Sequence, residues 1–277
     1  MKIKFYIIIL FFALIVNSCA ALRNGGKSNE NDIISYTTGW YEDNGLSPKY
    51  ITYSREEVLL LLPEKKRKSP RLDFFIDTLD VLDNSERRLL QRFLYEDLSC
   101  QEYASKMFNQ VKAEYLKKKN EAALYPDRPY DWSYTEAFDG RIYYPVFVVS
   151  RSRYIFSGGA HGQNEKIFFV LDRNLLSKVE LDDILVNGAK ASLQKYIDDV
   201  LRERYHAAPD TPLTTIGFLN DTAGVPDNFF ITRGGLGFCW NPYEIAPYVM
   251  GTIDVILPYS QIENLINDRG KDLFRDL

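Results

Sequence analysis

The sequence is poor in the residues that build metal and redox centres. It has two histidines, His161 and His206, and three cysteines. A catalytic zinc site takes about three protein ligands, and no H-E-x-x-H or comparable spacing occurs. A G-x-S-x-G nucleophile elbow is also missing. We therefore predict no catalytic residue, no cofactor and no metal; a site of His161, His206 and a carboxylate is the metal alternative.

A dense basic surface is missing as well. The net charge is −4, and the basic cluster at residues 65–68 lies between two prolines and is interpreted as a solvated loop. Binding to DNA or RNA requires concentrated positive charge. We therefore predict no nucleic-acid partner.

The composition is nevertheless that of a folded protein, with 45% hydrophobic, 26% charged and 14% aromatic residues. In residues 33–139, three helix-capping signatures precede apolar stretches, at Ser54, Asp83 and Ser99. We predict a short helix from Ser54 that ends before Pro63, and longer helices after Asp83 and Ser99. This region is therefore predicted to be mainly helical.

Residues 140–277 follow a different pattern, in which segments rich in aromatic and β-branched residues are separated by turn-forming residues. Such segments favour strands, whereas helical periodicity predicts two further helices, over residues 188–205 and 259–266. The predicted strands cover residues 142–150, 153–157, 167–172, 229–232, 236–240 and 252–257. Because strands and helices mix without regular βαβ alternation, we predict an α+β fold: a helical N-terminal part, then a largely antiparallel sheet packed with helices.

The N-terminus has the pattern of an export signal. Two lysines precede an apolar run that is shorter than the roughly 20 residues needed to span a membrane. The next residues, Val-Asn-Ser-Cys at 16–19, resemble the lipobox of bacterial lipoproteins, in which the cysteine is lipidated. We predict a signal peptide at residues 1–18 and a lipid, such as palmitate, on Cys19. The alternative is an ordinary signal peptide cut near Ala20 or Ala21.

Residues 19–32 are rich in Asn, Gly, Lys and Ser and cannot bury enough apolar surface to fold, so we predict a tether there. Acyl chains on Cys19 would anchor the protein to a membrane of the cell envelope. Since no acidic run follows Cys19, we predict that the protein faces the periplasm.

Four stretches carry a family resemblance: residues 154–162 (Tyr-Ile-Phe-Ser-Gly-Gly-Ala-His-Gly), 181–185, 235–238 and 241–251. In order and spacing they resemble the C-terminal domain shared by the anti-sigma factor RsiV and the non-catalytic region of the peptidoglycan deacetylase PdaC. The resemblance covers roughly residues 143–265. It implies an extracytoplasmic domain associated with cell-wall functions, which in the RsiV branch binds lysozyme. We recognise neither a sigma-factor-binding segment nor a deacetylase module, so those two activities are not expected.

The Gly-Gly-Ala-His turn is the first candidate binding site. Gly158 and Gly159 can adopt positive φ and let another group approach the backbone, and His161 could bond a ligand or titrate near neutral pH. The alternative is that His161 locks the turn by bonding a neighbouring carbonyl. In a second loop, Tyr243 and Tyr248 each follow a proline that restricts the chain. This loop is the second candidate, because loops held by a scaffold often carry recognition residues.

Other groups have mainly structural interpretations. The aromatic residues could form an exposed saccharide-stacking surface or belong to the core. Those residues are Tyr130, Trp132, Tyr134, Trp240, Tyr243 and Tyr248. The Asp-Asp pair at 182–183 is interpreted as a helix N-terminus and the pair at 198–199 as a solvated helix face. An oxidising compartment would permit a Cys100–Cys239 disulfide, although the sequence does not show that the two meet.

Two functions follow from these patterns. The first is a lipid-anchored binding or sensing module of the cell envelope, whose ligand is a lysozyme-like protein or a cell-wall glycan such as peptidoglycan. The alternative is an envelope hydrolase of unrecognised type that uses His161 with a nearby carboxylate. An exposed aromatic or apolar patch would favour the first, and a deep pocket holding His161 against a carboxylate would favour the second.

Overall fold

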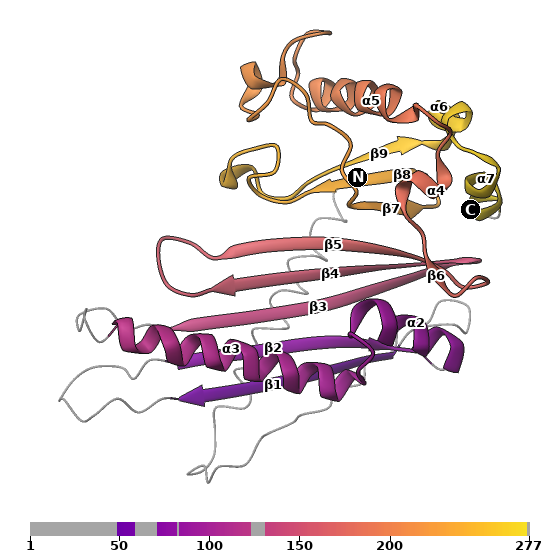
Figure 1. The fold of residues 1–277 in the computed structure, drawn as a ribbon. Helices are drawn as coiled ribbons and strands as arrows, with labels where there is room; N and C mark the ends of the chain where they lie inside the picture. Colours follow the sequence, from indigo (N-terminus) through magenta and orange to yellow (C-terminus); the bar gives the residue numbers. More distant parts are fainter. Residues whose placement is uncertain (1–48, 59–70, 82, 123–130, 276–277) are drawn as a thin grey trace, which may run out of the picture. The chain divides into compact units, whose positions relative to one another are not determined.

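The computed structural model describes residues 49–58, 71–81, 83–122 and 131–275, which form two β-sheets with helices (Figure 1). The strands are β1 (Lys49–Val58), β2 (Arg71–Asp80), β3 (Trp132–Tyr143), β4 (Val146–Phe156), β5 (Gln163–Asp172), β6 (Ser177–Lys178), β7 (Phe229–Thr232), β8 (Gly235–Trp240) and β9 (Ile253–Pro258). The helices are α2 (Asn84–Leu94), α3 (Cys100–Ala122), α4 (Leu181–Ile184), α5 (Ala189–Arg204), α6 (Tyr259–Ile262) and α7 (Asp268–Phe274), with short 3₁₀ turns η1 (Leu213–Ile216), η2 (Tyr248–Met250) and η3 (Glu263–Leu265). The α+β prediction is confirmed.

Several features of the sequence lie outside the described residues. They are the signal and tether with Cys19, the basic cluster at 65–68, and Tyr130. Among the helices that the structure does describe, none combines the length and the apolar character needed to cross a bilayer.

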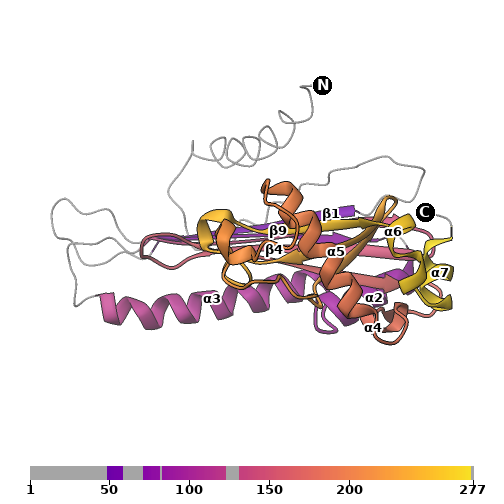
Figure 2. The ribbon, with the colours of Figure 1, turned by 90° about the horizontal axis from the view of Figure 1, so that it is seen from above.

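The larger sheet has six strands in chain order, from β1 to β6. Every pair is antiparallel except β2 and β3, which run parallel. A parallel pair needs a crossover connection, and α2 and α3 lie on that connection. Both helices cover one face of the sheet (Figures 1 and 2). β3 runs continuously across residues 139 and 140, where the sequence suggested a change of region.

The predicted helix at Ser54 is wrong, because this residue lies in β1 and pairs with Phe75 of β2. A capping signature is a local signal of about 1 kcal/mol. Pairing along a ten-residue strand satisfies many more backbone groups, so the tertiary interaction prevails over the local one.

The two longer helices are confirmed, and each begins where the capping signature places it. Asp83 caps α2 by accepting from Ser85 N and Glu86 N. At the start of α3, Glu102 Oε2 accepts from Ser99 N at 2.9 Å, and Ser99 Oγ accepts from Glu102 N at 3.3 Å. This reciprocal arrangement is a capping box.

The predicted strand over residues 142–150 is two strands. β3 ends at Tyr143 and β4 begins at Val146, with a cis Tyr144-Pro145 peptide in the turn between them. Proline removes a backbone donor and cannot continue a central strand. The register pairs Tyr143 with Val146, as a tight hairpin requires.

The C-terminal elements agree closely with the predicted ones. The predicted strands at 229–232, 236–240 and 252–257 correspond to β7, β8 and β9, which form the three-stranded sheet. The predicted helix at 188–205 is α5, which buries Leu193, Ile197 and Leu201 against the core of this sheet. The predicted closing helix is shorter: α6 passes into η3, and α7 follows after a break.

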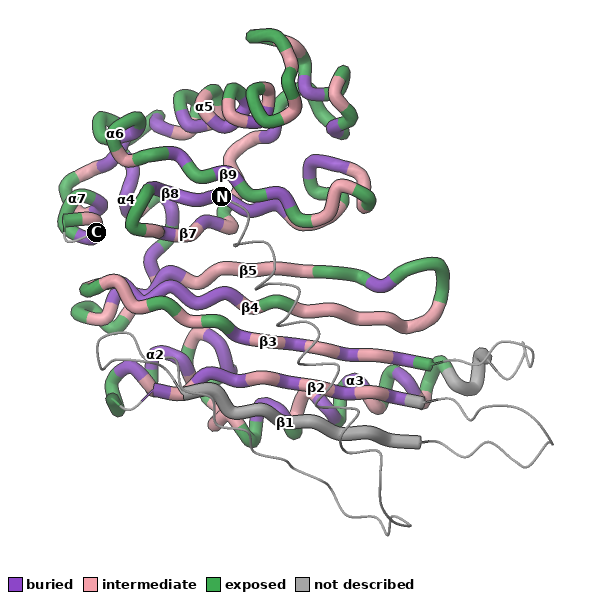
Figure 3. The backbone as a smooth tube through the Cα atoms, turned by 180° about the vertical axis from the view of Figure 1, so that it is seen from behind, coloured by how far each residue is buried: buried purple, intermediate pink, exposed green. Residues whose placement is uncertain are grey.

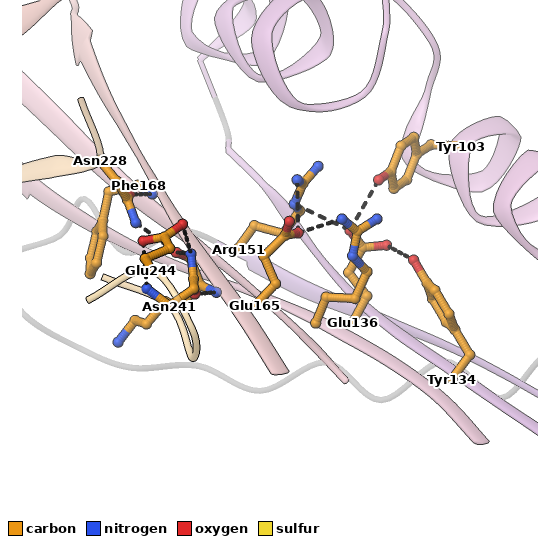
Figure 4. A network of polar contacts seen from close by, with 11 residues as sticks. Tyr103, Tyr134, Glu136, Arg151, Glu165, Phe168, Asn228, Asn241 and Glu244 are labelled. Carbon is orange, nitrogen blue, oxygen red and sulfur yellow. Dashed lines mark hydrogen bonds and ion pairs between the residues drawn. The ribbon is translucent and has the colours of Figure 1, made fainter. Parts of the chain in front are cut away.

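Two asparagine side chains join the smaller sheet to the edge of β5. Asn228 Oδ1 accepts from Phe168 N at 2.9 Å, and Asn228 Nδ2 donates to Lys166 O at 2.8 Å. Asn241 Oδ1 accepts from Lys166 N at 2.6 Å (Figure 4). The two amides therefore take the place of a neighbouring strand along this part of the edge.

Candidate functional site

The Gly-Gly-Ala-His turn lies in the hairpin between β4 and β5. Gly158 and Gly159 have φ of 89° and 101°, as the sequence predicted for a turn that only glycine adopts without strain. Gly162 is buried, and a Cβ there would come within 2.3 Å of the Tyr154 ring. The hairpin therefore needs glycine both for its backbone conformation and for close packing.

His161, Tyr243 and Tyr248, which we call the aromatic loop cluster, come together from two loops. The rings of His161 and Tyr248 are stacked, with centroids 3.9 Å apart and planes inclined by 20°. The Tyr243 ring lies 5.9 Å from that of Tyr248. Three of the residues singled out from the sequence are thus neighbours, although 82 positions separate His161 from Tyr243 in the chain.

Short hydrogen bonds hold the second loop in place. Asn241 N donates to Glu244 Oε2 at 2.7 Å, and Tyr243 N donates to Ala246 O at 2.9 Å. Tyr243 has φ of 72°, which is uncommon for a residue with a side chain. Such a conformation persists only where the surroundings enforce it, so the loop is built to place this tyrosine.

The cluster is open to solvent. His161 is exposed, Tyr243 is 59% exposed, and neighbouring Val249 is 90% exposed. Asn164 Nδ2 donates to the Tyr248 hydroxyl at 3.3 Å and fixes the outer end of that ring. Rings that are both fixed and exposed can be covered by a ligand at little cost in side-chain entropy.

The His161 ring also makes the backbone contact that the sequence offered as its alternative role. Nδ1 lies 2.9 Å from the carbonyl oxygen of Gly162, which requires a proton on Nδ1 and leaves Nε2 as the free acceptor of the neutral ring. In the described part of the chain the ring lies against Tyr248 and this carbonyl, not against a carboxylate. The two roles are compatible, because the bond to Gly162 orients the ring that Tyr248 stacks on.

The remaining aromatic candidates belong to the core. Trp132, Tyr134 and Trp240 are between 2% and 3% exposed. Trp132 and Tyr134 face α3 from β3, and Trp240 packs in the core between the smaller sheet and α5. A saccharide-stacking surface could therefore involve only Tyr243 and Tyr248 among the described candidates.

The acidic pairs have structural roles, with one correction. Asp183 Oδ2 accepts from Glu180 N at 2.9 Å at the start of α4, as expected for a helix N-terminus. Asp199 is exposed, but Asp198 is buried and accepts from Ala223 N at 2.8 Å. The predicted solvated face is thus wrong for Asp198, because α5 buries this side together with Ile197. No group of three metal-binding side chains occurs in the described residues.

The two cysteines of the described chain are free thiols. Cys100 is partly buried and Cys239 fully buried. Burial raises the pKa of both thiols, that of Cys239 to about 12. A neutral buried thiol is a poor nucleophile, so neither cysteine offers a reactive centre.

Sequence reasoning missed a buried polar cluster around Glu136 of β3, which is 0% exposed. Its carboxylate accepts from the hydroxyls of Tyr134 at 2.7 Å and Tyr103 at 3.1 Å, and Arg151 Nε lies 3.6 Å away (Figure 4). Arg151 also contacts Glu165 at 3.4 Å. Burial beside the Glu136 charge raises the pKa of both tyrosines, which keeps their hydroxyls as donors.

The signal for this cluster was present in the sequence. In the stretch Trp-Ser-Tyr-Thr-Glu-Ala-Phe at 132–138, the glutamate alternates in phase with three aromatic residues. On a strand this spacing puts all four on one face. A carboxylate on a core face must find donors, and Tyr103 and Arg151 supply them.

Comparison with known proteins finds one family model and solved structures that are similar to parts of this chain. Residues 182–260 match the family DUF3298, described as "Protein of unknown function". A solved DUF3298 family member from Bacteroides fragilis has a TM-score of 0.69 and 18% identity, over 83% of this chain and 98% of that one. A second solved DUF3298 family protein, from Pseudomonas aeruginosa, has a TM-score of 0.53 and 17% identity, over 79% of this chain and 94% of that one.

The structural likeness establishes the fold over most of the chain, and the sequence match places a DUF3298 segment in its C-terminal half. That segment contains Tyr243 and Tyr248 but not His161. No curated protein matches the sequence.

Proposed function

We propose that this protein is a lipid-anchored recognition module of the bacterial cell envelope, which binds a lysozyme-like protein or a cell-wall glycan through the aromatic loop cluster. The observation that carries the proposal is the exposed His161 ring stacked on the half-buried Tyr248 ring, beside Tyr243, which is 59% exposed. Aromatic faces provide large contact areas with few rotatable bonds, and they dominate the centres of protein interfaces. A sugar ring can cover the same faces.

The resemblance to the domain of RsiV and PdaC supports the envelope context. The motifs that carry it include the hairpin with His161 and the loop with Tyr243 and Tyr248, which are the segments that meet in the cluster. The lipobox-like Cys19 supplies the anchor in this proposal. No specific contact of His161 favours the hydrolase alternative, so we do not propose it.

Binding is tested by calorimetric titration of the full chain in detergent with lysozyme and, separately, with purified muropeptides. We expect saturable binding of one of them that Tyr248→Ala weakens by at least about tenfold, the effect of a central interface residue. Tyr144→Ala is the matched control, because Tyr144 is also 59% exposed but lies in the β3–β4 turn. Binding of neither ligand, or equal loss in both variants, would remove the proposal.

Anchoring is tested by growth with a clickable palmitate analogue. We expect the wild-type chain to be labelled and the Cys19→Ser variant to remain unlabelled and leave the membrane fraction. An unlabelled wild-type chain whose mature N-terminus lies near Ala20 would establish the ordinary signal peptide instead.

A further inference from the structure

A groove of about 460 Å³ lies between the two sheets, with walls from β3, β4 and β5 on one side and β7, β8 and β9 on the other. We call it the sheet-face groove. Its six-stranded wall is the face that α2 and α3 leave uncovered, seen from behind in Figure 3. The volume is within the range of about 300–1,000 Å³ found for ligand sites.

The floor of the groove is aromatic and fixed. The rings of Phe168 and Phe230 stack with centroids 4.3 Å apart and planes inclined by 25°. Asn228 holds the backbone of Phe168. Gly237 makes room for the other ring, because a Cβ there would come within 2.2 Å of Phe230. An apolar group of a ligand would therefore meet a preformed surface.

Four charged side chains line the groove. Asp139 and Arg141 of β3 form an ion pair with each other at 3.8 Å, whereas Lys166 and Asp254 are opposite charges on its two walls. Lys166 of β5 lies on one side, with its ammonium 5.0 Å from the centre of the Phe168 ring, and Asp254 of β9 lies on the other. Cys239 of β8 also lines the groove, and Lys166 lowers the pKa of its thiol whereas Asp254 raises it. In the described part of the chain, neither Lys166 nor Asp254 is in an ion pair, with the other or with a third residue.

We propose that the sheet-face groove binds a short zwitterionic peptide, with its carboxylate on Lys166, its ammonium on Asp254 and an apolar side chain on Phe168 and Phe230. A neutral sugar would cover both charges without pairing them, which is costly. A simple anion would be repelled by Asp254 and a simple cation by Lys166. Only a ligand with both charges and an apolar part matches all three features. This site is separate from the aromatic loop cluster and does not depend on the function proposed for it.

The probe is the tripeptide Ala-Phe-Ala, titrated calorimetrically into the full chain in detergent, together with its N-acetylated and C-amidated forms. We expect the free tripeptide to bind and each capped form to bind at least about tenfold more weakly, because each loses one charge-assisted hydrogen bond. Absence of binding by the free tripeptide, or equal binding of all three peptides, would overturn the proposal.

Two variants assign the ends of the peptide. Lys166→Met keeps the apolar stem, and we expect it to bind the free and C-amidated peptides equally while still rejecting the acetylated one. We expect Asp254→Asn to bind the free and N-acetylated peptides equally while still rejecting the C-amidated one. Lys178→Met, which removes a partly exposed lysine of β6 outside the groove, should leave all three affinities unchanged. If either variant loses its preference for the free peptide over both capped forms, or over the wrong one, the assignment of the peptide carboxylate to Lys166 and of its ammonium to Asp254 would be overturned.

Discussion

The Glu136 cluster beneath α3 and the aromatic loop cluster at the hairpin between β4 and β5 use the same residue types in opposite ways. Both combine tyrosine with a polar or titratable partner. Glu136 is fully buried, and its carboxylate contacts Tyr134 of the same strand, Tyr103 of α3 and Arg151 of β4. Tyr243 and His161 are exposed, and the rings of both lie beside that of Tyr248.

The difference teaches where to look for function in this protein. A buried carboxylate needs its donors, so replacement of any member affects folding first. An exposed aromatic ring that the backbone holds in place contributes little to the stability of the fold, which leaves its face available to a partner. Substitutions in the Glu136 cluster should therefore lower stability, whereas substitutions in the aromatic loop cluster should weaken binding and change stability little.

The strongest test of this comparison is Glu136→Ala. Its removal leaves two tyrosine hydroxyls buried without their acceptor and takes one of two carboxylate partners from Arg151, and we expect a loss of about 3–5 kcal/mol in the free energy of unfolding. Urea denaturation followed by circular dichroism measures it. Glu165→Ala, at a position 36% exposed, is the control and should cost less than about 1 kcal/mol. If Tyr248→Ala destabilises the protein as much as Glu136→Ala, the distinction between the clusters fails.

Asn228→Ala should have an intermediate effect. Its amide bonds two backbone groups of β5, so we expect a loss of about 1–3 kcal/mol and faster hydrogen exchange at the Phe168 amide. Asn174→Ala, which removes an exposed asparagine whose side chain accepts from the Tyr144 hydroxyl, is the matched control. Unchanged exchange at Phe168 would show that the asparagine does not protect the strand edge.

The smallest effect is expected for Asp198→Asn, and it depends on pH. Burial raises the pKa of Asp198, so its ionised form is disfavoured in the folded state and its contribution to stability falls as the pH rises above the unfolded-state pKa. An asparagine at this position does not ionise, so it loses no stability as the pH rises. Its side-chain oxygen can still accept from Ala223 N. We expect the variant to be more stable near neutral pH, with the difference shrinking towards about pH 3. A difference that stays constant between the two pH values would contradict this account.

Much of the C-terminal half was predictable because its elements carry local signals. α5 buries residues at helical spacing, and β7 and β8 are short apolar runs between turn residues. β1 and β2 were not predictable in the same way. β1 carries a capping signature and adjacent charges, and β2 had no predicted element, although Leu72, Phe74 and Ile76 alternate in its sequence and are buried.

For the candidate site, the sequence identified the residues but not their association. Glycines before His161 and prolines before Tyr243 and Tyr248 mark two rigid turns. Nothing local indicates that the two turns stack on each other. The sheet-face groove was not anticipated at all, because Lys166 and Asp254 lie 88 positions apart in the chain and belong to different sheets.

The sequence by itself determined the fold class, the positions of α2, α3 and α5, and the composition of both loops, because periodicity, capping and turn chemistry act over a few residues. Only the tertiary structure decided that Ser54 belongs to a strand, that Glu136 is buried, and that His161 meets Tyr248. Those outcomes depend on contacts between segments distant in the chain, and the free energy of such contacts has no counterpart in a local pattern.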